Sequence, residues 1–377
     1  GDIAAWCALR GFRVTLQDQA PERIAPAIKR AHTLFKRKLK RTPRITAAMD
    51  RLMPDHKGLG VQQADVIIEA IFEDVDVKRS LYKGIEPRMK PEAILATNTS
   101  SIPLEELASS LAQPGRLVGL HFFNPVARMQ LVEVVTGKST SSEVATHAMA
   151  FTRQIDRLPL PVSSTPGFLV NRILMPYLME AVVLESEGVP PALIDAAATA
   201  FGMPMGPVEL ADTVGLDICL HVAEILAGHF NAEIPKRLKR LVAAGKLGKK
   251  SGAGFYVYKK GKAIKPRARG GSWNREEITN RLVLRMLNES VSCLREGVVA
   301  DRDLLDAGMI FGTGFAPFRG GPMHHIEAIG RDALLQQLQS LQKLRGDRFT
   351  ADAGWVSLFK SSEETLHEQG TPEQDSR

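Results

Sequence analysis

The stretch RLVGLHFFNPVARMQLVEVVTG, residues 116–137, carries most of the evidence for the fold and for the chemistry of this chain. Two apolar runs, 116–125 and 129–137, flank a short loop, and their length and composition predict buried β-strands. His121 lies where the first strand runs out into the loop, at the edge where open α/β sheets place their ligands. Glu133 follows twelve residues later, inside the second run.

Further apolar runs on the N-terminal side extend the same sheet. They are ADVIIEAIFE (64–73), AILATNTSS (93–101) and FRVTLQD (12–18), the last of which ends in Asp18. Residues 2–10 predict a helix with Gly11 at its C-terminal cap. Continuous apolar strands that alternate with helical segments indicate a parallel sheet covered on both faces. We therefore predict a doubly wound α/β domain over residues 1–163.

The sequence changes character from residue 167, where long helical patterns begin, and this half repeats itself. The first copy has Asn171-Arg172, Glu187-Gly188-Val189, Asp195, Phe201-Gly202 and Gly206-Pro207; the second has Asn280-Arg281, Glu296-Gly297-Val298, Asp306, Phe311-Gly312 and Gly321-Pro322. The spacing from Asn-Arg to Glu-Gly-Val is identical, so the sequence predicts a duplicated all-α unit. The glycine-rich segment GKLGKKSGAGFYVY lies between the copies and lacks the spacing of a phosphate-binding loop.

The neighbours of Glu133 indicate how its carboxylate is used. It stands among Leu131, Val132, Val134 and Val135, and a carboxylate buried there without a partner would cost several kcal/mol. We expect His121 to be that partner, because a carboxylate fixes the imidazole tautomer and stabilises the imidazolium formed when the ring takes a proton. A core histidine beside an unrelated glutamate is the more common arrangement for a lone pair and stays open here.

Asp18 predicts a nucleotide contact only in combination with its surroundings. In a dinucleotide-binding unit, the second strand ends in an acid that accepts hydrogen bonds from the adenosine ribose. An aspartate that forms a turn is the more frequent explanation of such a residue. The first strand and the glycine-rich phosphate turn are missing from the sequence, which begins at Gly1, so we expect weak NAD binding by the chain as written.

Small polar residues gather at two further places. Asn98, Thr99, Ser100 and Ser101 close a predicted strand at the same edge of the sheet as His121, and Asn171 opens the first helical copy. Such residues usually cap helices or form turns. They also suit hydrogen bonds to a substrate oxygen, and the spacing alone does not decide between the two.

The composition excludes several classes of protein. The net charge of +7 is concentrated in residues 29–44, which hold eight Lys or Arg and no acid, a pattern that attracts phosphates or forms a solvated helix face. A single aromatic residue, Phe35, lies among these charges, which gives no row of stacking platforms and disfavours nucleic acid. Pro176, Glu180 and Glu185 interrupt the most apolar stretch, so no membrane span is expected. Widely spaced Cys7, Cys219 and Cys293 indicate reduced thiols and a cytoplasmic location, with Cys7 in the core.

HFFNPVARMQLVEVV, ATNTSS, ADVIIEAIFEDVDVK and GFLVNRIL, in this order and spacing, resemble the 3-hydroxyacyl-CoA dehydrogenase family over residues 1 to about 330. The repeated helical unit is most similar to the dehydrogenase portion of the multifunctional fatty-acid oxidation α subunit, in which an enoyl-CoA hydratase domain lies N-terminal. The resemblance implies a Rossmann-type domain at 1–163, two helical domains at 164–262 and 263–360, and a disordered tail at 361–377.

The resemblance also assigns roles to individual residues. The catalytic set is His121 with its carboxylate partner Glu133, and Ser100 and Asn171 as contacts of the substrate oxygen and thioester. The cofactor set is Asp18, Ile71, Phe72, Glu73, Lys78, Asn98, Ser100 and Asn124. Lys38 on the basic helix is the expected phosphate contact of CoA, where a serine of some relatives is Ala31. The pair His324-His325 replaces an aromatic of relatives, and without a third ligand it indicates a surface pair rather than a metal site.

The implied activity is oxidation of an L-3-hydroxyacyl-CoA to a 3-ketoacyl-CoA with NAD as cofactor. A thiolase subunit is the implied partner, in a homo- or hetero-oligomer. Two alternatives remain at this stage. One is a dehydrogenase of a free 3-hydroxy acid, which would have no use for a basic helix; the other is a non-catalytic module, which the missing glycine turn favours.

Overall fold

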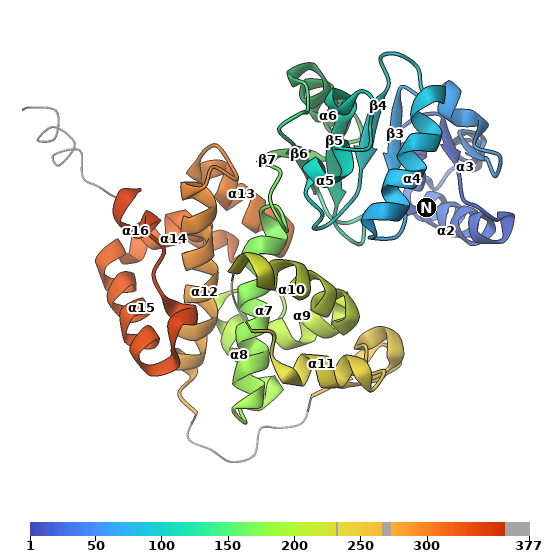
Figure 1. The fold of residues 1–377 in the computed structure, drawn as a ribbon. Coiled ribbons are helices and arrows are strands. Elements are labelled where there is room, and N and C mark those ends of the chain that lie inside the picture. Colours follow the sequence, from blue (N-terminus) through green and yellow to red (C-terminus); the bar gives the residue numbers. More distant parts are fainter. Residues whose placement is uncertain (231–232, 266–272, 359–377) are drawn as a thin grey trace, which may run out of the picture. The chain divides into compact units, whose positions relative to one another are not determined.

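The computed structural model describes residues 1–230, 233–265 and 273–358 and divides the chain into two compact units, Gly1–Phe168 and Leu169–Arg377 (Figure 1). The first is an α/β unit and the second is a helical unit. The predicted boundary at 262/263 within the helical half stays a prediction, and the tail expected at 361–377 lies outside the described residues.

A five-stranded sheet forms the centre of the first unit. In spatial order its strands are β3 (Val66–Glu69), β4 (Ile94–Thr97), β5 (Leu117–Phe122), β6 (Leu131–Thr136) and β7 (Leu158–Ser163). Strands β3 to β5 are parallel, β6 runs antiparallel to β5, and β7 is parallel to β6. The prediction of a parallel sheet is therefore wrong at β6 and β7. Residues 123–130 join β5 directly to β6, and a parallel crossover needs about a dozen residues or more.

A smaller parallel pair lies beside this sheet. Strand β1 (Val14–Leu16) pairs with β2 (Leu52–Pro54), and helices α1 (Asp2–Leu9), α2 (Pro21–Leu39) and α3 (Thr42–Asp50) pack around it. Helix α2 is amphipathic: Ile24, Ala27, Ala31 and Phe35 are buried while its basic residues are largely exposed. Gly11 has a φ of 103°, which fits its predicted place after the end of α1.

One face of the main sheet is covered by an apolar layer. Side chains alternate between the faces of a strand, and Ile94, Ala96, Val118, Leu120, Val132 and Val134 pack with Trp6 of α1 and Ala148 of α6 (Ser142–Gln154) on one face. His121 and Glu133 therefore point to the opposite face. Helices α4 (Val75–Ile85) and α5 (Leu104–Ala108) belong to this unit as well (Figure 1).

The second unit is built on two long helices, α7 (Val170–Ser186) and α12 (Arg275–Arg295), which pack against each other and are buried over most of their length. The remaining helices are α8 (Pro191–Phe201), α9 (Pro207–Val214), α10 (Leu216–Phe230), α11 (Lys236–Ala243), α13 (Arg302–Thr313), α14 (Pro322–Ile329), α15 (Arg331–Arg345) and α16 (Gly354–Ser357). A hairpin of β8 (Val257–Lys259) and β9 (Lys262–Ile264) follows the glycine-rich segment. Single 3₁₀ turns are η1 (Leu59–Gln62), η2 (Glu86–Arg88), η3 (Pro114–Arg116), η4 (Lys249–Ser251), η5 (Pro317–Arg319) and η6 (Asp347–Phe349).

The two sequence copies make the same local contacts. Asp195 accepts hydrogen bonds from the backbone amides of Val208 and Glu209 in the first turn of α9. Asp306 accepts them from Met323 and His324 in the first turn of α14. Each aspartate thereby caps the α-helix that follows its own helix along the chain.

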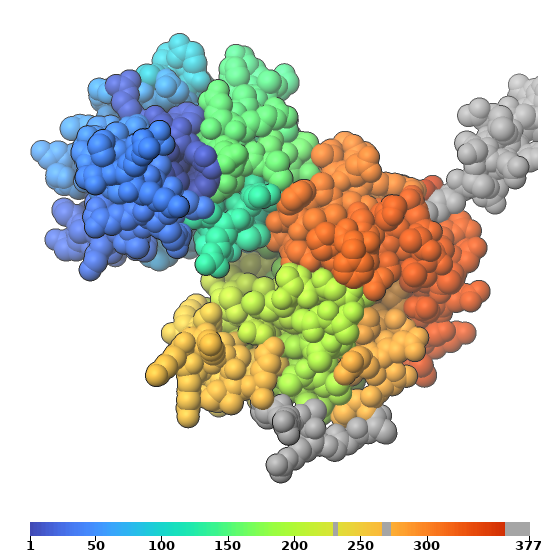
Figure 2. Space-filling view, turned by 180° about the vertical axis from the view of Figure 1, so that it is seen from behind, coloured from blue at the N-terminus to red at the C-terminus, as the bar shows by residue number. Residues whose placement is uncertain are grey.

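The two repeated sequence segments also contact each other. The rings of Phe201 and Phe315 meet edge to face at 5.6 Å between centroids, and the guanidinium of Arg319 donates to the Phe201 carbonyl. Figure 2 shows the segments near residues 200 and 310 closely packed on one face of the helical unit. Neither copy encloses a separate core at this contact.

Two sequence predictions about composition can be compared with the structure. Cys7 is 5% exposed within the core of the first unit, as predicted, and Cys219 and Cys293 are also buried free thiols. Across residues 1–230, 233–265 and 273–358, no helix has both the length and the apolarity needed to cross a bilayer.

Candidate active site

His121 and Glu133 face each other across the antiparallel pair β5–β6, as register partners. The imidazole Nδ1 lies 2.6 Å from Glu133 Oε2, and the two residues are 5% and 0% exposed. The contact predicted from the sequence is confirmed. A buried carboxylate at this distance fixes Nδ1 as the protonated nitrogen of a neutral ring, which leaves Nε2 to exchange a proton with a bound group.

Two aromatic rings hold the imidazole in place. The Phe123 ring is 4.6 Å from the His121 ring between centroids, and the Phe168 ring is 5.7 Å away, both tilted by nearly 60°. Phe168 is fully buried and has a φ of 52°, a left-handed backbone that is uncommon for a bulky residue. The backbone at the end of the unit thus adopts an unfavourable conformation at the residue that packs against the histidine.

The polar loop after β4 is held by the carboxylate of Glu73. Its Oε1 accepts hydrogen bonds from Thr99 Oγ1 (2.6 Å), Ser100 N (2.7 Å) and Ser100 Oγ (3.1 Å). Burial raises the pKa of Glu73, but hydrogen bonds from Thr99 and Ser100 and the charge of Lys78 outweigh it, so the pKa lies below its ordinary value. The structure brings Glu73 and Ser100 together and fixes the orientation of the serine.

Lys78 is fully buried and neutralises two carboxylates. Its Nζ lies 2.7 Å from Glu69 Oε1 and 3.5 Å from Glu73 Oε2. Glu69 also accepts from the Ile71 amide (2.7 Å), the Tyr82 hydroxyl (2.7 Å) and Thr97 Oγ1 (2.9 Å). Lys78 lies beneath the surface and joins α4 to the end of β3 and to the loop after it, and its expected contact with the cofactor stays a prediction.

Asn98 and Asn124 meet at one pocket of the first unit. Asn98 Oδ1 accepts from the Phe122 amide at 2.9 Å, which joins the end of β4 to β5 one residue after the histidine. The pocket has a volume of about 220 Å³ and is lined by Gly1, Asp2, Ile3, Arg30, Asn98, Phe122, Asn124 and Val126. The start of α1 contributes to its wall, and backbone amides of a first helical turn bind anions.

The remaining predicted residues of this unit lie at its surface. Asp18 follows β1, with its Oδ1 bonded to the Gln19 amide at 2.7 Å. Ile71 is 40% and Phe72 is 73% exposed, directly after β3. Lys38 is exposed in the last turn of α2. Their contacts with a ligand stay predictions.

Two predictions concern the helical unit. Asn171 is half-buried in the first turn of α7, and its role stays a prediction. The surface pair expected at His324-His325 is wrong for His325, which is 7% exposed and packs edge to face on Phe201 at 5.3 Å. Burial, with a smaller effect from Arg319, lowers the pKa of His325 to about 4. Within the described residues, no three potential metal ligands cluster.

Comparison with known proteins decides the family. Residues 1–165 match the model of the 3-hydroxyacyl-CoA dehydrogenase NAD binding domain, and residues 167–258 match that of the C-terminal domain. The structure of (S)-3-hydroxybutyryl-CoA dehydrogenase from Ralstonia eutropha is 34% identical, with a TM-score of 0.66, and the match covers 69% of this chain and 95% of that one. The chain belongs to the 3-hydroxyacyl-CoA dehydrogenase family.

Relatives of this dehydrogenase family match most of the chain. The fatty acid oxidation complex subunit alpha of Shewanella baltica is 37% identical over 358 residues, which is 89% of the chain and 50% of that protein. The chain thus spans about half the length of the curated relatives it matches. The 3-hydroxybutyryl-CoA dehydrogenase of Escherichia coli K12 has a TM-score of 0.83 at 27% identity, covering 98% of this chain and 96% of that one.

Sequence reasoning missed several side chains that shape this candidate site. Glu69 was detectable, because it is a lone carboxylate in the apolar run ADVIIE and poses the same pairing problem as Glu133. Phe123 was visible beside the histidine, but its ring contact was not. Tyr82 and Phe168 carried no signal, since only the fold brings them to the buried lysine network and to the histidine.

Proposed function

We propose that this chain is an NAD-dependent dehydrogenase that oxidises the 3-hydroxyl of an L-3-hydroxyacyl-CoA to the 3-ketoacyl-CoA. The observation that carries the proposal is the buried contact of 2.6 Å between His121 and Glu133 inside a domain of this family. A histidine with one nitrogen held by a carboxylate is a general base for a hydroxyl proton near neutral pH.

Several residues fit the cofactor. Asp18 is suited to accept hydrogen bonds from the adenosine ribose, and the exposed Ile71 and Phe72 offer an apolar surface after β3. Asn98 and Asn124 line the pocket at the start of α1, where amides favour phosphate. When bound, NAD⁺ accepts the hydride from C3 of the substrate.

The chain itself supplies position and proton transfer. His121 Nε2 accepts the proton of the 3-hydroxyl, and Glu133 stabilises the imidazolium that results. Ser100, whose hydroxyl donates to Glu73 in this structure, is the proposed second contact of the same substrate oxygen, and it would turn from Glu73 to donate its proton there. Asn171 is the proposed contact of the thioester end. Orienting these groups before reaction removes much of the entropic cost of the step.

The test is NADH formation from NAD⁺ and L-3-hydroxybutyryl-CoA by the full-length polypeptide, followed at 340 nm. We expect turnover with the CoA thioester and none with the free 3-hydroxy acid. Lys38 and the basic face of α2 are proposed to bind the CoA phosphates, so KM should rise with salt for CoA thioesters and stay constant for truncated ones. Turnover of the free acid alone would contradict the proposal, and absence of NADH with either substrate would favour a non-catalytic module.

The repeated contacts support a finer proposal about architecture. Residues 164–262 and 263–360 are proposed as two copies of the family's helical domain, because the Asp195 and Asp306 caps match in position and in partners. Curated relatives of about twice this length are subunits of a fatty acid oxidation complex. A thiolase subunit is the proposed partner of the whole protein, and copurification with that subunit would test it.

A further inference from the structure

Helices α7 and α12 exchange two sets of buried ion pairs. Arg172 of α7 lies 2.6 Å from Glu289 and 2.7 Å from Glu296, both near the end of α12. Arg281 of α12 lies 2.6 Å from Glu180 of α7 and 2.6 Å from Glu187 just after it. The two sets have the same spacing. Glu289 and Glu296 follow Arg281 by eight and fifteen residues, and Glu180 and Glu187 follow Arg172 by the same intervals.

The two sets agree in spacing, but their inner carboxylates differ: Glu289 is 12% exposed, whereas Glu180 is 1% exposed and also lies 2.8 Å from Arg348. The side chains of Arg172 and Arg281 are 1% and 2% exposed, and those of Glu296 and Glu187 are 32% and 33% exposed. A buried guanidinium is stable only when it is paired, and removing a partner leaves an uncompensated charge. Disrupting either set should therefore destabilise the helical unit, although Glu180 keeps Arg348 as a partner when Arg281 is changed.

The helix contexts of the two arginines differ. Arg172 is the third residue of α7, which begins without a side-chain cap, directly after the left-handed backbone of Phe168. Arg281 lies almost two turns inside α12, which is capped by Asn274 through bonds to the next helical amides. Arg172 thus joins the first turn of α7 to α12, whereas Arg281 joins α12 to α7 at a point well inside the helix.

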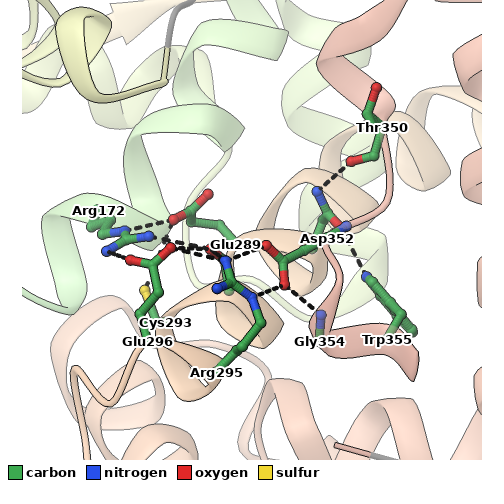
Figure 3. A network of polar contacts seen from close by, with 11 residues as sticks. Arg172, Glu289, Cys293, Arg295, Glu296, Thr350, Asp352, Gly354 and Trp355 are labelled. Carbon is green, nitrogen blue, oxygen red and sulfur yellow. Dashed lines mark hydrogen bonds and ion pairs between the residues drawn. The ribbon is translucent and has the colours of Figure 1, made fainter. Parts of the chain in front are cut away.

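The carboxylates that hold Arg172 are themselves anchored (Figure 3). Arg295 lies 3.0 Å from Glu296 and 2.7 Å from Asp352. Asp352 accepts from the Gly354 amide at 2.7 Å, at the start of α16. The first turn of α7 is therefore connected, through Glu296 and Arg295, to the last helix of the described chain.

We infer that Arg172 is a positioning residue for Asn171, its neighbour in the first turn of α7. The ion pairs of Arg172 with Glu289 and Glu296 fix the first turn of α7 against α12. They thereby fix the position of the Asn171 side-chain amide, which is the proposed contact of the acyl-CoA. The inference rests on the proposed function, in which Asn171 is a substrate contact. Asn280, the equivalent neighbour of Arg281, has no such role, and this makes Arg281 a matched control.

The experiment compares Arg172→Lys with Arg281→Lys in the full-length protein. Both variants should lower the melting temperature, since each weakens two ion pairs of a buried guanidinium. Arg172→Lys should raise KM for the acyl-CoA by about tenfold with an unchanged KM for NAD⁺, because small displacements of a positioned group cost up to a hundredfold. Arg281→Lys should change both constants by less than twofold. Equal effects of the two variants on KM would overturn the inference.

Two further comparisons keep the inference testable if an arginine variant does not fold. Glu296→Gln and Glu187→Gln remove one partially exposed partner from each set, and only the first should raise KM for the acyl-CoA. In a double-mutant cycle, adding Arg172→Lys to Asn171→Ala should raise KM for the acyl-CoA little further, because both substitutions act through the Asn171 side-chain amide. Additive effects would contradict the inference. Wild-type NADH formation is the separate test of the proposed function, so the two failures are distinguishable.

Discussion

Replacing Glu133 by glutamine preserves the size of the side chain and removes its negative charge. The carboxylate lies 2.6 Å from the imidazole and is fully buried, so solvent does not screen the pair. Charges centred about 4 Å apart at an effective dielectric constant of about 20 interact by about 4 kcal/mol. This interaction exists only when His121 has taken the proton, so its loss should lower kcat roughly 10³-fold.

The assay is steady-state NADH formation with saturating substrates, together with the Kd for NAD⁺ and the melting temperature. We expect Glu133→Gln to keep its affinity for NAD⁺ and most of its thermal stability. Glu105→Gln is the control, because Glu105 is a hydrogen-bonded carboxylate of the same unit that accepts from Lys138 and Ser164. If Glu133→Gln retained a kcat within tenfold of the wild type, the role assigned to the pair would be refuted.

Three other substitutions test separate parts of the structure. His121→Ala should abolish turnover while sparing NAD⁺ affinity, as measured by NADH formation and cofactor titration. Glu69→Gln leaves Lys78 buried with one carboxylate fewer and should cost about 3 kcal/mol of unfolding free energy in denaturant titration, with partial recovery in the double variant Glu69→Gln/Lys78→Met. His325→Phe should stabilise the protein in acid relative to the wild type. Burial lowers the pKa of His325 in the folded protein to about 4, so the wild type loses stability as the pH falls from 6.5 towards 4, and the phenylalanine variant does not.

Each of these has a result that would contradict it. Turnover by His121→Ala at the wild-type rate would remove the histidine from the mechanism. A Glu69→Gln variant as stable as the wild type would mean that the remaining carboxylate suffices for the lysine. For His325, the difference in melting temperature between variant and wild type should grow as the pH falls from 7 to 4.5. A constant difference over that range would show that the imidazole does not titrate on unfolding there.

The contact between His121 and Glu133 was predictable from the sequence because one physical rule covers it. A carboxylate in an apolar strand needs a partner, and a histidine twelve residues earlier was within reach of a returning strand. The direction of β6 was not predicted, because an apolar run gives no strand orientation, and the short loop between the strands was not weighed. The loop length, read alone, favoured the antiparallel pairing that makes His121 and Glu133 register partners.

Other parts of the site depended on information that the sequence does not hold locally. The sequence placed Lys78 near the cofactor, but its burial between Glu69 and Glu73 follows from how α4 packs over β3 and β4. The burial of His325 likewise arises from its contact with Phe201, more than a hundred residues away. The Asn-Arg and Glu-Gly-Val repeat was visible in the sequence, whereas the crossing of its ion pairs between α7 and α12 was not.

The four ion pairs of Arg172 and Arg281, which connect the α7 and α12 segments, have a consequence for how the helical unit responds to dilution. When matching surfaces lie on separate subunits, their association weakens as the protein concentration falls, and the melting temperature falls with it. Here both arginines and all four of their carboxylates belong to one polypeptide. The covalent link keeps their effective concentration constant, so this contact survives at concentrations where a two-chain equivalent would come apart.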